Sequence, residues 1–160
     1  MNGSPDRRRS RAPRVSAALV LALGLLEVAC GRGSPTGPAA VAWDRDTCER
    51  CAMAIGDRRF AAQIRSGASG EVHRFDDLGC ASLWLDEHRD GVGGRPEVWV
   101  RDLRGERWLD AIASIYAPGL RSPMSYGFGA SPEPVEGGIR WDEVRDRIRE
   151  IERERRRRGR

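Results

Sequence analysis

The sequence predicts an α+β fold of two small ββαβ-like halves with antiparallel sheets, closed by a C-terminal amphipathic helix. Residues 58–65 alternate between two faces, and residues 71–77 begin a second strand after a turn at 67–70, which indicates a β-hairpin. Residues 78–89 then carry apolar side chains at helical spacing. With 160 residues, of which 39% are hydrophobic, the chain can bury one core or two small halves that share it.

The first half is expected to cover residues 44–103. Asp76 and Asp77 are candidate N-caps of its helix, because a short carboxylate side chain can accept hydrogen bonds from the first free N–H groups. The glycines of "GVGG" at 91–94 end this helix, and "PEVWVRDL" at 96–103 is the third strand.

The second half is expected to cover residues 104–158. It begins with a strand at 107–114 and continues through loops rich in Gly, Pro and Ser, with one short strand near 125–130. The closing helix, 139–158, is predicted from apolar residues spaced three, four and three apart: Trp141, Val144, Ile148 and Ile151.

The first 29 residues have the pattern of an export signal peptide. An arginine-rich start precedes the apolar run Val15–Leu26, which is shorter than the roughly 20 residues that a membrane span needs. Ala29 followed by Cys30 matches the end of a lipoprotein signal, although Glu27 stands where an aliphatic residue is usual. We therefore expect lipid attachment at Cys30, export, and anchoring at the outward face of a membrane.

Two alternatives to lipidation are ordinary cleavage after Ala42 and an uncleaved anchor. In the favoured interpretation, residues 30–42 form a flexible tether, because they are rich in Gly, Pro, Ser and Ala. The folded domain then covers residues 43–160.

The net charge of +4 does not indicate nucleic-acid binding. All 28 basic residues are arginine, and the excess of positive charge lies in residues 1–29 and 141–160. The part between is slightly negative, so a continuous basic face is not expected.

Cys48, Cys51 and Met53 place three sulfur atoms within six residues. A disulfide between Cys48 and Cys51, or from either to Cys80, is the simplest interpretation in an exported protein. A thioredoxin-like motif opens a helix, whereas the residues after Cys51 predict a strand and a turn. A thiol oxidoreductase therefore remains only as an alternative.

Two metals are also compatible with these residues. Structural zinc needs four ligands, for which Cys80, His73 and His88 are further candidates without a familiar spacing. Cu(I) prefers thiolate and thioether and accepts two or three ligands. If residues 51–55 are extended, Cys51 and the methionine two residues later project from one face, which favours copper. Three nearby arginines could favour the Cys51 thiolate: Arg50, Arg58 and Arg59.

A set of phrases in a fixed order resembles the NosL family of exported, usually lipid-anchored copper chaperones for nitrous oxide reductase. They are "DTCERCAMAI", "RFAAQI", "HRFDDLGCASLWL", "VWVRDLRGERWLDAIASIY" and "SPMSYGFGAS". The resemblance implies the two-half α+β fold and delivery of Cu(I), with a membrane ABC-type transporter complex as partner.

The resemblance also implies ligands. The family's Cys-x-Met corresponds to Cys51 and Met53, and the methionine of its Pro-Met phrase corresponds to Met124. Cys48 is a candidate third ligand or resolving thiol. The chain departs from the family at Ala52, where glycine is usual.

The remaining chemically active side chains receive structural interpretations. His73 is expected to be a satisfied surface histidine, and His88 a cap at the end of a helix. Cys80 is expected in the core, and helix capping is the simplest role for Asp76 and Asp77.

Together, the sequence predicts a Cu(I) metallochaperone that is not an enzyme and serves nitrous oxide reductase or another cuproprotein client. A disulfide-stabilised binding module without metal is the alternative from another class.

Overall fold

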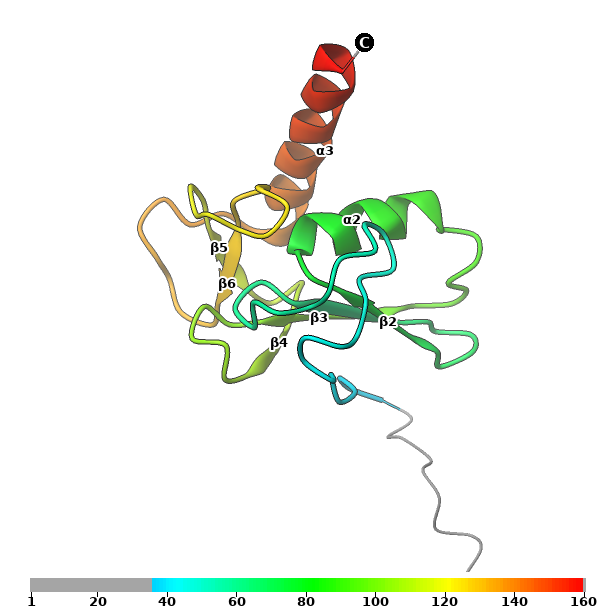
Figure 1. Ribbon diagram of the computed structural model, residues 1–160. Coiled ribbons are helices and arrows are strands. Elements are labelled where there is room, and N and C mark those ends of the chain that lie inside the picture. Colours follow the sequence, from blue (N-terminus) through cyan, green and yellow to red (C-terminus); the bar gives the residue numbers. More distant parts are fainter. Residues whose placement is uncertain (1–35, 160) are drawn as a thin grey trace, which may run out of the picture. The chain divides into compact units, whose positions relative to one another are not determined.

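The computed structural model describes residues 36–159. Within this range, the chain forms a four-stranded sheet, a two-stranded sheet and two helices (Figure 1). In chain order the elements are β1 Ala62–Arg65, β2 Val72–Phe75, α2 Leu78–Glu87, β3 Glu97–Arg101, β4 Trp108–Asp110, β5 Ile115–Ala117, β6 Gly129–Ser131 and α3 Trp141–Arg158. This confirms the α+β class that the sequence predicts.

The larger sheet has the order β2-β1-β3-β4, with every pair of neighbours antiparallel. The predicted hairpin is confirmed, with Ala62 of β1 opposite Phe75 of β2. β1 is central and buried along its whole length, so its side chains alternate between two covered faces. α2 covers one of these faces (Figure 1).

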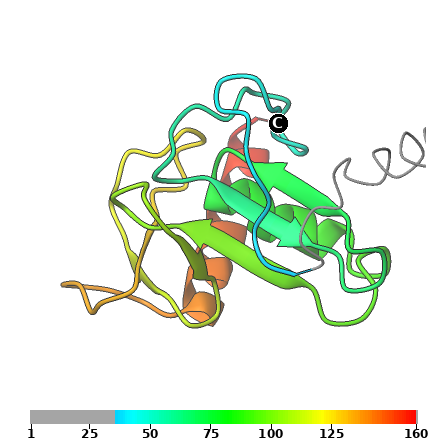
Figure 2. The same ribbon diagram turned by 90° about the horizontal axis from the view of Figure 1, so that it is seen from below.

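The first described residues cover the other face of the sheet. Gln63 exchanges two hydrogen bonds of 2.8 and 2.9 Å with the backbone of Ala39, and Arg65 donates to the carbonyl of Gly37. Figure 2 shows this segment crossing in front of the strands, opposite α2. The sequence predicts a flexible tether over residues 30–42. Its last part is instead fixed to the sheet, because these buried polar side chains of β1 need hydrogen-bond partners.

The larger sheet extends past the expected end of the first half, because β4 pairs with β3. Asp110 then ends β4, since its carboxylate accepts the N–H groups of Ile112 at 2.8 Å and Ala113 at 3.0 Å and so forms a turn. The strand expected at 107–114 is therefore shortened to β4, and β5 was not expected from the sequence. β6 corresponds to the short strand expected near 125–130 and pairs with β5.

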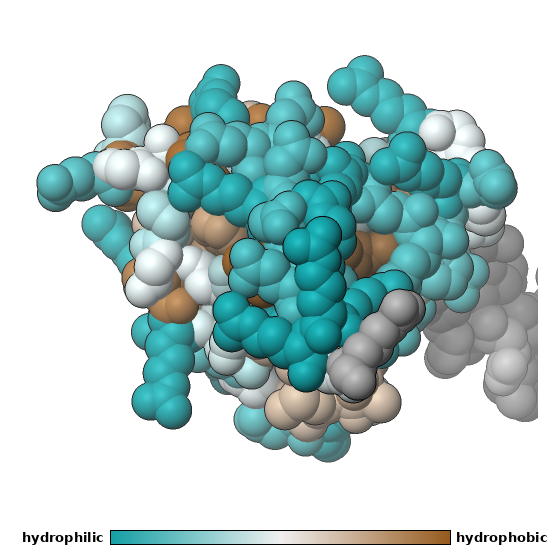
Figure 3. All heavy atoms as spheres, turned by 90° about the horizontal axis from the view of Figure 1, so that it is seen from above, coloured by the Kyte–Doolittle hydropathy of each residue, from teal (hydrophilic) through white to brown (hydrophobic). Residues whose placement is uncertain are grey.

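α3 is the amphipathic helix that the sequence predicts. Trp141, Val144 and Ile148 are buried, and the ring of Trp141 lies 6.0 Å from that of Tyr116 in β5. Acidic residues lie in the first turn and arginines in the last, as the helix dipole favours. The C-terminal part of α3 projects from the sheets (Figure 1), and the surface around it is mostly hydrophilic (Figure 3).

The carboxylate of Asp86 joins α2 to α3. Arg149 donates to it from Nε at 2.6 Å and from Nη2 at 2.9 Å, and Arg145 donates to it as well. Burial opposes the ionisation of Asp86, but the guanidinium groups of Arg149, Arg89 and Arg145 outweigh it. The pKa of Asp86 therefore lies well below its usual range.

We expect Asp86→Asn to lower the free energy of unfolding by about 2 kcal/mol at neutral pH, since the two arginines of α3 lose their anionic partner. The pKa of Asp86 is lower in the folded than in the unfolded protein. This stability is therefore present above the unfolded value of about 4 and is lost as pH falls through the folded value. Urea denaturation at pH 7 and pH 2 checks this, with the exposed Asp90→Asn as control. An equal difference at both pH values would contradict the ion pair.

Two parts of the N-terminal prediction lie outside the described residues, namely the signal peptide, 1–29, and the lipidation site, Cys30. Among residues 36–159, no helix has the length and apolar character needed to cross a membrane.

Candidate metal centre

A tight loop at residues 47–54, called the cysteine loop below, presents the first two thiols of the site. The N–H of Cys48 donates to the carbonyl of Met53 at 2.8 Å, and the N–H of Ala52 donates to the carbonyl of Cys48 at 2.9 Å. The chain therefore turns back on itself between Cys48 and Met53, and Cys51 lies within the turn.

Ala52 explains why this segment is not a strand. Its φ of 61° lies in the left-handed region, which costs a residue with a side chain about 1–2 kcal/mol and which glycine adopts freely. The sequence-based expectation that residues 51–55 are extended is therefore wrong. Met53 is 50% exposed, whereas Cys51 is half-buried. The glycine that is usual at this position in the NosL family fits the same conformation without strain.

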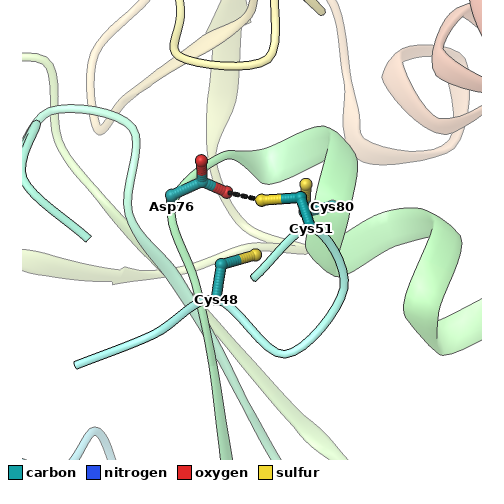
Figure 4. Close-up of side chains that lie close together, drawn as sticks. All are labelled: Cys48, Cys51, Asp76 and Cys80. Atoms are coloured by element: carbon teal, nitrogen blue, oxygen red, sulfur yellow. Dashed lines mark hydrogen bonds between the residues drawn. The ribbon is translucent and has the colours of Figure 1, made fainter. Parts of the chain in front are cut away.

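The other two donors come from the junction of β2 and α2. Asp77 is the N-cap of α2 and accepts the N–H of Gly79 at 2.8 Å, which confirms one of the two expected caps. The preceding Asp76 is thereby free for another role, and Cys80 follows in the first turn of α2. Four potential ligand atoms lie within 4.8 Å of one another (Figure 4): those of Cys48, Cys51, Asp76 and Cys80. This group of side chains is a candidate metal site and is called the metal cluster below.

The metal cluster is closed on most sides. Cys48 is 1% exposed, Cys80 is 0% exposed and Asp76 is 2% exposed, so Cys51 is the half-buried member through which the cluster meets the surface. Cys51 Sγ donates to Asp76 Oδ1 at 3.4 Å. The other carboxylate oxygen, Asp76 Oδ2, is buried without a hydrogen-bond partner among the described residues. A buried carboxylate in this state is well placed to accept a proton or bind a cation.

The protons of the metal cluster are unevenly shared. A hydrogen bond from Cys80 lowers the pKa of Cys48 to about 4, against the opposing effect of burial. The same hydrogen bond raises the pKa of Cys80. Burial raises the pKa of Cys51 to about 12 and that of Asp76 to about 6. Cys48 is therefore the thiol that ionises most readily, and a metal that binds Cys51 and Cys80 must displace their protons.

The arginines near the cysteine loop do not promote ionisation of Cys51. Arg50 pairs with acidic residues of the two helices, the guanidinium of Arg58 lies 5.2 Å from the centre of the Trp43 ring, and Arg59 pairs with Asp57. The sequence-based expectation that they stabilise this thiolate is therefore wrong. The lowered thiol pKa belongs to Cys48 and comes from a neighbouring thiol.

Met124 lies in a second loop at residues 122–126, called the methionine loop below. The loop is attached to the N-cap of α2: Asp77 Oδ2 accepts the hydroxyl of Ser122 at 2.6 Å and the N–H of Met124 at 3.0 Å. Met124 is half-buried against the core. Its backbone is thus bound to the residue that follows Asp76, which places the methionine loop at the border of the metal cluster.

The fold is similar to a solved structure, described as the crystal structure of the copper chaperone NosL from Shewanella denitrificans. The two chains share 18% sequence identity and superpose with a TM-score of 0.55, over 68% of this chain and 96% of that one. This chain has a NosL-like fold. The sequence itself matches no protein-family model and no curated protein.

The two histidines of this NosL-like fold lie outside the metal cluster. Both rings contact Trp84, with centroids 4.3 Å from that of the indole. The ring of His88 stacks on the indole, and the ring of His73 is tilted against it by 35°. His73 Nδ1 lies 2.7 Å from Glu49 Oε2, and His88 Nδ1 lies 2.9 Å from the carbonyl of Trp84. His88 is the C-cap residue of α2, as the sequence predicts.

Asp76 and Cys80 were expected from the sequence to act in helix capping and in the core, and the structure places both in the metal cluster. One signal for Asp76 was available, because the N-cap position of a helix holds one residue and "DD" supplies two carboxylates. Cys80 is indeed buried in the core, and its position beside Cys48 depends on packing between α2 and the cysteine loop. That contact joins residues 32 apart, which no local pattern reports.

Proposed function

We propose that the protein is a Cu(I) metallochaperone and that its copper binds at the metal cluster. One observation carries this proposal: three cysteine sulfurs and one carboxylate converge within 4.8 Å in a NosL-like fold, with two thiols buried and the third half-buried. Thiolates are the ligands that Cu(I) prefers, and three of them satisfy its coordination.

The arrangement also suits release of the metal. Cys48 and Cys80 are buried and would bind the ion from the core side. Cys51 lies toward the surface and is followed two residues later by the exposed Met53. A thioether binds Cu(I) without losing a proton. The thioethers of Met53 and of Met124 on the methionine loop can therefore bind the ion as the thiolates dissociate from it. Asp76 accepts a hydrogen bond from the Cys51 thiol and is the nearest base for its proton.

The client and location follow from the resemblance of the sequence phrases to the NosL family. On this basis the protein delivers copper to nitrous oxide reductase or another cuproprotein, with a membrane ABC-type transporter complex as partner. It acts outside the membrane that its signal peptide crosses, held there by lipid on Cys30. It catalyses no reaction and binds no nucleic acid.

Anaerobic titration of the reduced full chain with Cu(I), in competition with a colorimetric chelator, tests this function. We expect one tightly bound ion, weakened about 100-fold by Cys51→Ser and about tenfold by Met53→Ala. Ile112→Ala is the matched control, because Ile112 is 52% exposed, close to the 50% of Met53, and lies in the turn after β4. Failure to compete for Cu(I), or wild-type binding in both variants, would show that the cluster is structural.

The same preparation distinguishes the alternatives. A disulfide-stabilised module contains fewer free thiols than cysteines before any reductant is added. A thiol oxidoreductase exchanges its disulfide with a client and is unaffected by Met53→Ala, since a thioether takes no part in thiol exchange. A copper chaperone shows free thiols and depends on the methionine.

A further inference from the structure

The cysteine loop is tied to α3 by Arg50, one of the two residues between its cysteines. Arg50 Nη2 lies 3.3 Å from Glu152 Oε1 of α3 and 3.2 Å from Glu87 Oε1 of α2. The Arg50 side chain is only 16% exposed, and these acidic partners hold its pKa above the usual value although burial opposes this. The guanidinium of Arg50 therefore forms its ion pairs with the two helices, and the position of the cysteine loop depends on these contacts.

The methionine loop is tied to the same turns of α3. Arg155 Nη2 donates to the carbonyls of Met124 at 2.8 Å and Ser125 at 3.1 Å. The guanidinium of Arg155 also lies 4.5 Å from the centre of the Tyr126 ring. Ser125 has a φ of 57°, a strained conformation that such contacts must compensate.

The two attachments are joined to each other. Tyr126 of the methionine loop donates its hydroxyl to Glu152 Oε2 at 2.9 Å, and Arg50 Nη1 lies 3.5 Å from the same hydroxyl. Glu152 therefore contacts both loops directly, and Arg155 is one helical turn further along the same side of α3. A change in this part of the helix reaches both loops at once.

We propose that Glu152 and Arg155 are positioning residues of the metal cluster, which hold the cysteine loop and the methionine loop in one arrangement and so set the rate at which the metal enters and leaves. The effect on copper release rests on the proposed function, whereas the effect on the position of the Cys51 thiol is independent of it. Neither residue touches the metal cluster itself.

Glu152 and Arg155 lie on a part of α3 beyond the residues that pack the helix against the rest of the fold. The buried residues of α3 end at Ile148, and its ion pair to α2 uses Arg145 and Arg149. Other charged pairs beyond that point stay within the helix, such as Arg153 with Glu150 at its surface. Glu152 and Arg155 reach instead to the loops, so their removal can loosen the site while α3 stays in place.

The first arm of the test needs no copper. Glu152→Gln and Arg155→Gln are compared with Glu150→Gln and Arg153→Gln, which remove the same groups from a pair confined to α3. In the reduced, metal-free full chain, the rate of alkylation of Cys51 by a maleimide is followed by mass spectrometry. We expect about a tenfold increase in the first two variants, the effect of losing one charged hydrogen bond, and none in the controls.

The second arm measures transfer of Cu(I) to a chelator and uses Met124→Ala. Arg155→Gln is expected to speed transfer in the wild-type background and to add little in the Met124→Ala background, because its effect acts through the Met124 thioether, which Met124→Ala removes. Arg155→Lys, which keeps a donor for the carbonyls, is expected to restore part of the wild-type rate. A variant that only destabilises the fold would show neither the lack of additivity with Met124→Ala nor the partial recovery with lysine.

The outcomes separate this inference from the proposed function. Wild-type alkylation in Glu152→Gln and Arg155→Gln, or the same increase in the controls, overturns the positioning role. So does an additive effect of Arg155→Gln and Met124→Ala on transfer. If the wild-type chain does not bind Cu(I) but the two variants show faster alkylation, the proposed function fails while the hold of α3 on the Cys51 thiol is supported.

Discussion

Replacing Cys80 by serine is expected to weaken Cu(I) binding by about 100-fold or more, although Cys80 is fully buried and was expected from the sequence to be a core residue. A serine hydroxyl has nearly the shape of the thiol but is a hard, protonated donor that Cu(I) binds poorly. Cys80 also supplies the hydrogen bond that lowers the pKa of Cys48 to about 4. A serine hydroxyl can still donate a hydrogen bond to Cys48, so the variant removes one soft ligand while the Cys48 thiolate keeps a donor beside it. Anaerobic competition with a Cu(I) chelator measures the loss.

Ser82→Ala is the matched control for Cys80→Ser. Ser82 lies two residues further along α2, is also fully buried, and its hydroxyl has no hydrogen-bond partner among the described residues. Its replacement changes a buried polar atom of the same helix without touching the metal cluster, so the Cu(I) affinity should stay at the wild-type value. If Cys80→Ser binds Cu(I) as tightly as the wild type, Cys80 is a core residue and the site is built without it.

The parts of the fold that the sequence predicts are those set by local pattern. The β1–β2 hairpin, the start of α2 at Asp77 and the buried stripe of α3 each depend on residues close together in the chain. The early end of β4 at Asp110 was missed because it is decided by one carboxylate, which accepts hydrogen bonds from two N–H groups of the following turn. The fixed end of the tether was missed because its partners lie on β1, more than 20 residues away.

The candidate site divides in the same way. The sequence identifies Cys48 and Cys51 because their spacing is local, and it suggests Met53 through an extended strand that the left-handed Ala52 rules out. Asp76 and Cys80 complete the metal cluster only after α2 packs beside the cysteine loop. Whether Met53 and Met124 bind copper stays a prediction, because their thioethers belong to the loops at the border of the cluster rather than to the cluster itself.

Asp77→Ala is expected to lower the free energy of unfolding by about 3 kcal/mol, since one buried carboxylate serves three donors. It accepts hydrogen bonds from the N–H of Gly79 at 2.8 Å, the hydroxyl of Ser122 at 2.6 Å and the N–H of Met124 at 3.0 Å. Alanine removes the acceptor of all three donors at a position that is 0% exposed. Urea denaturation at neutral pH measures the change.

Asp77→Asn separates the two roles of this side chain, because its single carbonyl oxygen can keep either the cap of α2 or the anchor of the methionine loop. We expect it to lose about half as much stability as Asp77→Ala. Asp90→Ala, an exposed aspartate beyond the other end of α2, should change stability little. If Asp77→Ala were as stable as Asp90→Ala, the methionine loop would be held by α3 alone. With the predicted loss, the junction that places Asp76 and Cys80 also fixes Met124, and the site depends on both helices.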